Sequence, residues 1–379
     1  MSKAQRKATT PAQEHSVPWF WPMAAGIELA DEGMTIFGDN LKFAAAAGTI
    51  TVPPPPGWAT KSEVILDLST MHLRDFSRTA DRGALPVLID APYAGHSSTI
   101  ADYDKGQSLV ETLLDGGLRR VLVTDWKSAT PEMRYFDVDT YLAELNVAID
   151  DLGGRVHMIG LCQGGWMSAM YAARFPGKVA SLVLAGSPID TAAGEGTIRK
   201  MAHKLPMSFF EEMVAAGEGR MLGKFMLAGW KNMHPDEQYM SKYLDLYEHI
   251  EDKSYVERTE HFERWYENPI DLPGRWYLQA IRELFKDNRL AKGTFVALGR
   301  TITLKDIKVP LYLLAGEADD ITTREQVFNA EHLVGTPAHE IVKKLVPGGH
   351  IGLFMGSRTL RDAWPEIAAW VRRHEPRTL

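Results

Sequence analysis

The segment VHMIGLCQGGWMSAMYAARFP, residues 156–176, restricts the fold of this chain more than any other stretch. An apolar run typical of a buried strand ends at GLCQGG and passes without a spacer into a sequence that favours a helix. A turn this sharp requires small residues on both sides, and Gly160 and Gly164 supply them. It would lift the side chain of Cys162 off the sheet. The pattern therefore predicts a strand–elbow–helix unit that presents a cysteine nucleophile.

Cys162 is the only cysteine among 379 residues, and two interpretations of it are open. As a nucleophile, its thiolate would be favoured by the positive end of the following helix, and the backbone N–H of Gln163 would face the reacting carbonyl. The alternative is a small buried cysteine, which protein cores often contain. The strand before Cys162 and the helix after it favour the nucleophile. A single cysteine also excludes an internal disulfide and a multi-cysteine metal site.

Short apolar runs alternate with helical runs over most of the chain. The runs that predict strands are 62–69, 85–92, 119–126, 155–161, 179–188, 309–316 and 340–349. The runs that predict helices are 108–117, 137–154, 165–176 and 363–374. This alternation predicts an α/β fold, with a mostly parallel sheet and helices on both of its faces.

The same alternation divides the chain into four parts. Residues 1–18 are polar and predict a disordered tail, and residues 19–57 predict an amphipathic helix followed by a proline-rich linker. Residues 58–190 and 306–379 would form the α/β core. Residues 191–305 are rich in aromatic residues and methionine and predict a helical insertion. Because open sheets bind ligands at their carboxyl edge, we expect the insertion to cap that edge; a plain helical layer is the alternative.

Composition narrows the class of protein. Hydrophobic residues make up 45% of the chain and charged residues 24%, which is enough apolar material for a large core, and the net charge is −7. The sequence contains no stripe of basic residues that would indicate nucleic-acid binding. The basic N-terminus has no apolar stretch behind it, so no secretory signal is expected, and no apolar run is long enough for a transmembrane helix. These features predict a cytoplasmic protein without a metal or cofactor.

A cysteine nucleophile needs a base and an acid that orients the base. In folds with such elbows, the acid follows a later strand and the histidine follows the last one. The run at 309–316 continues into two aspartates, of which the spacing to the next branched residue favours Asp319; Asp320 is the alternative. The last run ends in Gly-Gly and His350. We therefore predict a triad of Cys162, Asp319 and His350.

The segment DAPYAGHSS, residues 90–98, follows an early predicted strand and should complete an oxyanion hole. Beside the N–H of Gln163, the second donor would be the backbone N–H of Tyr93 or Ala94. His96 follows closely and is expected either at the mouth of the pocket or in a structural role. The candidate pocket residues are His96, Trp166 and Asp320.

At these residues the sequence resembles the polyhydroxyalkanoate synthases and the intracellular polyhydroxyalkanoate depolymerases, two related families. The resemblance covers residues 60–375. GLCQGG and NRLAKG (288–293) are similar to synthase segments, whereas DAPYAGHSSTI, VTDW, GSPIDT (186–191) and the Asp-Asp-Ile of the acid loop are similar to depolymerase segments. The resemblance implies an α/β-hydrolase fold with a Cys-Asp-His triad.

The first expectation for function is a depolymerase. In this thiol-dependent ester hydrolase, His350 activates Cys162 and water cleaves the thioester acyl-enzyme. The alternative is a synthase that transfers 3-hydroxyacyl units from coenzyme A to a growing polyester. A non-catalytic granule-binding protein is less favoured, because all three triad residues are present in the correct order. The expected partner is a hydroxyalkanoate polyester or oligomer at a granule surface, or a coenzyme A thioester for a synthase; the oligomeric state is open.

Overall fold

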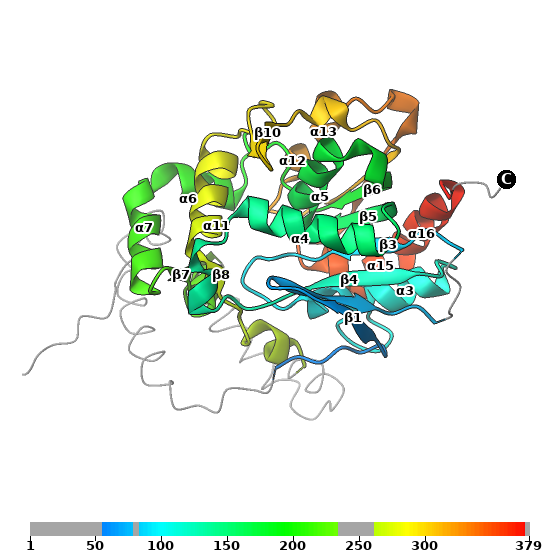
Figure 1. Ribbon diagram of the computed structural model, residues 1–379, viewed down its shortest axis with the longest axis horizontal. Helices are drawn as coiled ribbons and strands as arrows, with labels where there is room; N and C mark the ends of the chain where they lie inside the picture. Colours follow the sequence, from blue (N-terminus) through cyan, green and yellow to red (C-terminus); the bar gives the residue numbers. More distant parts are fainter. Residues whose placement is uncertain (1–54, 79–82, 234–260, 376–379) are drawn as a thin grey trace, which may run out of the picture.

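The computed structural model describes residues 55–78, 83–233 and 261–375 (Figure 1). The predicted tail at 1–18 and nearly all of the segment predicted as helix and linker at 19–57 lie outside the described residues. The centre of the described chain is an eight-stranded sheet in the order β1-β2-β4-β3-β5-β6-β11-β12. Six of its strands, from β4 to β12 in that order, run parallel, and β2 runs antiparallel to both of its neighbours. The predicted α/β-hydrolase fold is therefore confirmed.

The strands are short and, in the middle of the sheet, completely buried. Their bounds are β1 Glu63–Asp67, β2 Met71–Asp75, β3 Val87–Asp90, β4 Val121–Trp126, β5 Val156–Leu161, β6 Val179–Ala185, β11 Leu311–Gly316 and β12 Ile341–Val346. Because β3, β5, β6, β11 and β12 all point the same way, the loops that follow them meet at one edge of the sheet. A site built from those loops is expected at that edge.

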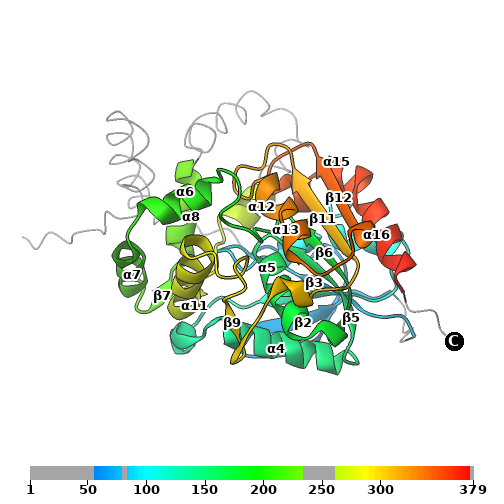
Figure 2. The same cartoon turned by 90° about the horizontal axis from the view of Figure 1, so that it is seen from above.

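Helices cover both faces of the sheet (Figures 1 and 2). On one face α3 packs against α15 and α16, and on the other α4 packs against α5. The bounds of the core helices are α3 Leu109–Asp115, α4 Val138–Asp151, α5 Gln163–Arg174, α12 Arg324–Phe328, α13 Ala330–Leu333, α14 Gly352–Met355, α15 Ser357–Asp362 and α16 Trp364–Arg373. Single 3₁₀ turns lie at η2 Ser98–Asp102, η3 Pro131–Tyr135, η4 Pro176–Lys178, η7 Leu304–Asp306 and η8 Ala338–Glu340.

Strand β2 was not expected from the sequence. The run at 62–69 predicted one strand, and the structure has a hairpin in which β1 is followed at once by β2. In β2, Met71 and Leu73 are fully buried, while His72 and Arg74 point to the other side. This is the alternation of a half-buried strand, but the charged residues broke up the apolar run on which the prediction relied.

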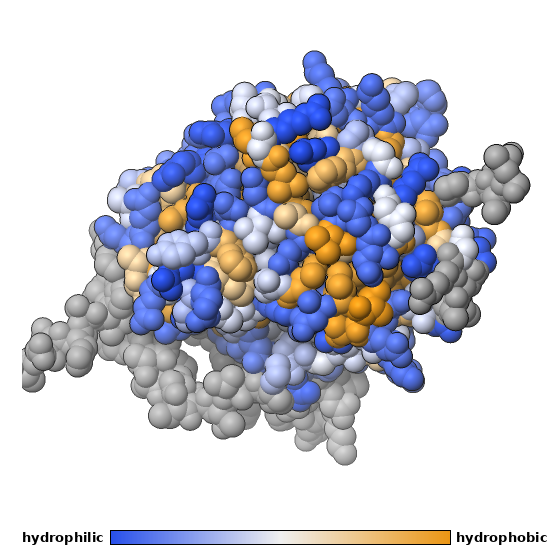
Figure 3. All heavy atoms as spheres, viewed as in Figure 1, coloured by the Kyte–Doolittle hydropathy of each residue, from blue (hydrophilic) through white to orange (hydrophobic). Residues whose placement is uncertain are grey.

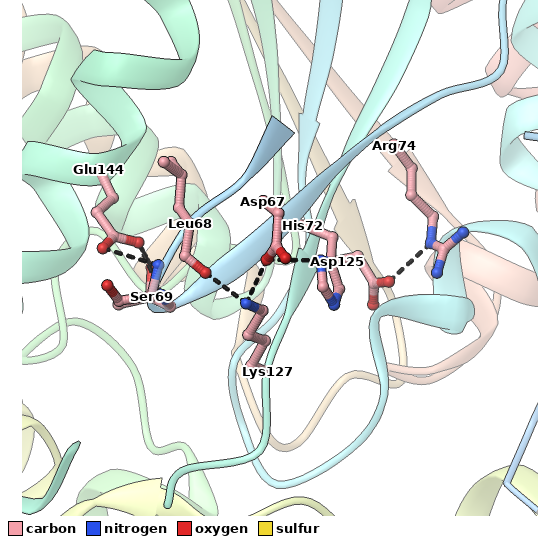
Figure 4. Close-up of polar contacts among 9 residues, drawn as sticks. Asp67, Leu68, Ser69, His72, Arg74, Asp125, Lys127 and Glu144 are labelled. Atoms are coloured by element: carbon pink, nitrogen blue, oxygen red, sulfur yellow. Dashed lines mark hydrogen bonds and ion pairs between the residues drawn. The ribbon is translucent and has the colours of Figure 1, made fainter. Parts of the chain in front are cut away.

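Polar contacts hold the hairpin in place at the edge of the sheet (Figure 4). Lys127, just after β4, donates hydrogen bonds to the carboxylate of Asp67 and to the backbone carbonyl of Leu68. Glu144 of α4 accepts from the backbone N–H of Ser69 at 3.1 Å. These contacts satisfy backbone groups at the turn between β1 and β2 that would otherwise have no partner within the sheet.

The edge strand β1 exposes apolar side chains. Val64 is 44% exposed and Ile65 41%, and Figure 3 shows hydrophobic residues gathered on the face of the molecule where β1 lies. An open edge strand can pair with other chains, but the register of β1 shifts between Val64 and Leu66, as in a β-bulge. Such an irregularity interrupts the row of free backbone groups and makes continued pairing less favourable.

The segment between β6 and β11 leaves the sheet and lies beside it, to the left in Figure 1. Its described elements are α6 Thr197–Lys204, α7 Met207–Ala216, β7 Arg220–Met221, α8 Gly223–Met233, β8 Leu272–Pro273, α11 Gly274–Gln279, the π-helix η6 Ala280–Lys286, β9 Val296–Ala297 and β10 Arg300–Thr301. Strands β7 and β8 pair with each other, as do β9 and β10, so small two-stranded ladders occur where only helix was expected.

The connection from β5 to α5 is a sharp elbow. Cys162 stands at its apex with φ 48° and ψ −114°, a left-handed conformation that a residue with a side chain adopts at a cost. The turn brings the start of α5 against neighbouring strands, so that a Cβ at Gly164 would lie 2.1 Å from the carbonyl oxygen of Asp90. The glycine is required because no side chain fits between the helix and the end of β3.

We expect Gly164→Ala to destabilise the fold by about 3 kcal/mol or more, since an added methyl must push rigid backbone apart. Gly177→Ala is the matched control, because a Cβ there would meet nothing within 4 Å. Urea unfolding followed by circular dichroism measures both free energies of unfolding. Equal stability of the two variants would show that α5 does not depend on this close contact.

Candidate active site

Three loops at the carboxyl edge of the sheet bring the predicted triad together. Cys162 follows β5, Asp319 follows β11 and His350 follows β12. His350 Nδ1 lies 2.7 Å from Asp319 Oδ2. A carboxylate can only accept this hydrogen bond, so Nδ1 carries the hydrogen and Nε2 is left for Cys162. The arrangement is that of a nucleophile, a base and an acid that orients the base.

The carboxylate of Asp319 is fixed by its own loop. The side chain is buried, and its second oxygen, Oδ1, accepts from the backbone N–H groups of Ile321 and Thr322 at 3.1 and 2.9 Å. These bonds stabilise the ionised carboxylate and hold it at one angle to the imidazole. Asp319 can therefore orient His350 without further groups.

The electrostatics of His350 favour an imidazolium. Burial alone would lower the pKa of His350, but the charge and hydrogen bond of Cys162 and the charge of Asp319 outweigh it and hold that pKa well above its usual range. A positive imidazolium beside sulfur, together with the first turn of α5, stabilises a thiolate. Cys162 is thus placed to react as a thiolate–imidazolium pair.

Asp320 is the alternative acid that the sequence left open. It is exposed, and it lines neither of the two cavities beside Cys162. Its backbone carbonyl accepts from the N–H of Thr197 at 2.9 Å, which joins the acid loop to α6. Asp319 is therefore the better candidate for the acid, because it contacts His350, whereas Asp320 lines neither cavity.

The geometry helps to choose between Tyr93 and Ala94 as the second oxyanion donor. The backbone N–H of Tyr93 donates to the side-chain carbonyl of Gln163, so that group already has a partner. Ala94 lines both cavities beside Cys162, and in the described part of the chain its N–H has no competing acceptor. Gln163 is the first residue of α5, where backbone N–H groups have no partner within the helix. The N–H groups of Gln163 and Ala94 are the better pair of donors.

Two apolar cavities meet at Cys162. Both are lined by Ala94, Cys162, Trp230 and Ile321. We call the first the tryptophan cavity; its further lining includes Trp166, Met201, Met226, Trp276, Ile281 and Phe285. We call the second the histidine cavity; its further lining includes His96, Ile100, Phe262, Trp265, Tyr266, His350 and Phe354.

The tryptophan cavity has a rigid aromatic wall. Trp166 of α5 is almost completely buried and stacks on Trp276 of α11, with ring centroids 5.7 Å apart. The π-helix contributes Ile281 and Phe285. Such irregular helices are rare and occur often at functional sites. Trp166 thus lies on the cavity wall, where the sequence predicted it, and so does Trp276 from the aromatic-rich insertion. Ile281 and Phe285 of the π-helix were not singled out as pocket residues, because their sequence pattern is that of any buried helix.

The histidine cavity holds His96, which the sequence left between a pocket role and a structural one. Its ring stacks on Trp265 and Tyr266, with centroids 4.7 and 5.1 Å away. His96 Nε2 lies 3.0 Å from the backbone carbonyl of Tyr266. The residue therefore has both a fixed ring and a place on the cavity wall beside His350.

Asp90 is a buried acid that sequence reasoning did not include in the site. It ends β3 against the first turn of α5, and its Oδ2 accepts from Ser168 at 3.0 Å. Burial raises the pKa of Asp90 well above its usual range, although hydrogen bonds from Ser168 and Thr124 oppose the shift. Because burial disfavours the charged form of Asp90, the shift is in the direction that limits negative charge close to the elbow.

Two motifs far apart in the sequence meet at the base of the insertion. Asn288 of NRLAKG donates to Asp190 of GSPIDT at 2.7 Å, across 98 residues. Thr191 donates to the side-chain carbonyl of the same asparagine at 3.1 Å. These bonds tie the start of the insertion to its last helical segment and fix the insertion beside the site.

Among the residues that the structure describes, no cluster of three or more His, Cys, Asp or Glu side chains could hold a metal ion. None of the helices in the described ranges combines the length and the apolar character needed to cross a membrane.

The sequence is similar to named polyester polymerases. The poly(3-hydroxyalkanoate) polymerase subunit PhaC of Haloferax mediterranei is 28% identical over 323 residues, 82% of this chain and 63% of that protein. The subunit of the same name from Haloarcula marismortui is 28% identical over 75% of this chain and 58% of that protein. That of Synechocystis is 26% identical over 76% of both. The chain thus spans about three fifths of the length of the two haloarchaeal relatives.

Solved structures support the fold. A monoacylglycerol lipase from Paleococcus ferrophilus superimposes with a TM-score of 0.51 at 17% identity, covering 80% of this chain and 99% of that one. A carboxylesterase structure from Nitrososphaera gargenis has the same TM-score and identity, covering 81% and 98%.

The sequence profile of one family matches most of the chain. That family is described as "Protein of unknown function (DUF3141)", and the match covers residues 69–367, which include the elbow, the insertion, the acid loop and the histidine loop. The chain therefore belongs to the DUF3141 family, and within an α/β-hydrolase fold it is related in sequence to the poly(3-hydroxyalkanoate) polymerases.

Proposed function

We propose that this protein is a thiol-dependent acyltransferase of the polyhydroxyalkanoate synthase type, with Cys162, Asp319 and His350 as its triad. The observation that carries the proposal is a cysteine at an elbow, beside a histidine held by a buried carboxylate, at the junction of two apolar cavities. The relatives named as polymerases favour transfer from coenzyme A over hydrolysis, which the sequence had put first.

In the first half-reaction Cys162 becomes acylated. His350 Nε2 takes the proton of the thiol, and the thiolate attacks the carbonyl carbon of a 3-hydroxyacyl coenzyme A. The N–H groups of Gln163 and Ala94 stabilise the oxyanion that forms. When the carbon–sulfur bond to coenzyme A breaks, the imidazolium returns its proton to the departing thiolate. The product is a 3-hydroxyacyl thioester on Cys162, and the thioester bond that forms replaces the one that breaks.

In the second half-reaction the acyl group leaves Cys162. The terminal hydroxyl of an acceptor chain gives its proton to His350 and attacks the thioester, an ester bond forms, and the proton then passes to the sulfur of Cys162. The apolar walls of both cavities suit the methylene and methyl groups of a polyester. We propose the insertion, residues 191–305, as the cap that supplies these walls, since Trp230, Trp276 and Phe285 come from it.

Hydrolysis of polyester is the second candidate. Water in place of the acceptor hydroxyl would cleave the same thioester and release a hydroxyacid. The segment DAPYAGHSSTI favours this candidate, because it resembles the depolymerases and supplies Ala94 and His96 to the cavities. Either activity would place the protein at the surface of a polyester granule.

The deciding experiment offers the purified full-length chain 3-hydroxybutyryl-coenzyme A and, separately, amorphous poly(3-hydroxybutyrate). We expect release of free coenzyme A together with ester-linked oligomers, measured by thiol titration and mass spectrometry. Soluble hydroxyacid from the polymer, without oligomers from the thioester, would make the protein a depolymerase instead.

Replacing Cys162 with alanine should reduce turnover of every acyl substrate to background, because no group remains to carry the acyl intermediate. The change removes one sulfur atom, so the stability should fall by only about 1 kcal/mol. Rates of coenzyme A release and thermal unfolding curves, measured on the same preparation, test both expectations. Retained turnover in a correctly folded variant would refute a cysteine mechanism.

The two aspartates should differ sharply. Asp319→Asn removes the acid of the triad, so the rate should fall by roughly 10²–10⁴-fold. It also removes a charge that raises the pKa of His350, so the alkaline limb of the pH–rate profile should move to lower pH. Asp320→Asn, the matched control, should change neither, because its side chain is exposed. Profiles of kcat/KM against pH for both variants provide the measurement. A larger loss for Asp320→Asn would reassign the acid.

A further inference from the structure

We propose that the histidine cavity holds the water or alcohol that attacks the thioester of the acyl-enzyme. We further propose that His96 favours water over an alcohol as the attacking group. The inference rests on the proposed acyl-enzyme at Cys162. It concerns the partition of that intermediate between hydrolysis and transfer, which the triad alone does not determine.

The hydrogen-bonding state of His96 follows from its neighbours. A backbone carbonyl can only accept, so the contact with Tyr266 requires the hydrogen on Nε2 and leaves a lone pair on Nδ1. Burial lowers the pKa of His96 to about 4, opposed by the bond to Tyr266 and aided by the charge of Lys231. The ring is therefore neutral at neutral pH, and Nδ1 acts as an acceptor.

This acceptor is available to a ligand. Among the residues that the structure describes, none donates a hydrogen bond to Nδ1, and the ring lines the histidine cavity. Two other polar side chains of the wall have partners, since Ser97 accepts from Thr99 and His350 is held by Asp319. The indole N–H of Trp230, also on this wall, is a donor without a partner among the described residues. The stacking on Trp265 and Tyr266 prevents His96 from turning away.

The imidazoles of His96 and His350 together restrict which attacking molecule binds well near them. The acceptor that attacks the thioester must donate a hydrogen to His350 Nε2. Water has a second hydrogen and can also donate to His96 Nδ1, whereas an alcohol has none left. An alcohol in the same place would leave Nδ1 without a partner in an apolar cavity, which is unfavourable. His96 is thus a positioning residue for water, and it gives a polymerase-like site a built-in tendency to hydrolyse.

The test measures two products of one intermediate. The full chain is supplied with 3-hydroxybutyryl-coenzyme A and a fixed concentration of methyl 3-hydroxybutyrate as the alcohol, and the ratio of free hydroxyacid to the ester-linked dimer is determined by mass spectrometry. His96→Phe keeps an aromatic ring for the stack but removes the acceptor. We expect it to lower the ratio of acid to ester about three- to tenfold, the factor that corresponds to one neutral hydrogen bond. A loss of folded enzyme would reduce both products and leave the ratio unchanged.

Further variants distinguish the loss of the hydrogen-bond acceptor from a change in the shape of the cavity. Phe262→Leu alters the wall of the same cavity without a polar atom and should keep the wild-type ratio. His96→Asn keeps an acceptor and should stay nearer to the wild type than His96→Phe does. If His96→Phe does not fold, His96→Leu replaces it.

Three outcomes would count against the proposal. An unchanged ratio in the variants without an acceptor overturns the role of His96 and leaves the proposed acyltransferase intact, as long as turnover still depends on Cys162. A ratio that falls equally in Phe262→Leu also overturns it, because shape alone would then explain the shift. Absence of any turnover that depends on Cys162 overturns the proposed function, and this inference with it.

Discussion

The close contact between the first turn of α5 and the ends of β3 and β6 is the constraint on which the site depends. Gly164 lies against the carbonyl of Asp90, and a Cβ at Gly165 would lie only 1.7 Å from the hydroxyl oxygen of Ser187. This contact forces Cys162 into a left-handed conformation and raises its sulfur above the sheet. It also places Gln163 at the first position of α5, directly after Cys162, so that the proposed nucleophile and one proposed oxyanion donor depend on a single packing constraint.

The charges around the elbow agree with that geometry. The positive end of α5 and the imidazolium of His350 both favour a thiolate, and Asp319 holds the imidazolium from the far side. Burial raises the pKa of Asp90, the other acid close to the elbow, well above its usual range and so disfavours a second negative charge there.

Residues of the insertion line both cavities beside Cys162. Hydrogen bonds from Asn288 to Asp190 fix its two ends to each other, and Arg220 pairs with Asp271 at 3.1 Å within it. Its aromatic residues then divide the space above Cys162 into two cavities of different character. One has a wall of stacked indole rings, and the other carries the two imidazoles. Under the proposed function, this division would let an acyl chain and an acceptor approach the same sulfur from different sides.

The sequence by itself determined an α/β fold with a mostly parallel sheet, because period and apolar runs identify buried parallel strands without knowledge of their neighbours. The expectation of an α/β-hydrolase fold came from the resemblance to known families. It also determined where to look for a nucleophile, since Gly160 and Gly164 around Cys162 have a local steric cause. Only the tertiary structure decided between Tyr93 and Ala94, because the side chain of Gln163, distant in sequence, occupies one of the two N–H groups. The two cavities and the hydrogen-bonding state of His96 were decided in the same way, by contacts between segments far apart in the chain. Such contacts leave no periodic trace in the sequence, and they set the chemistry of this site.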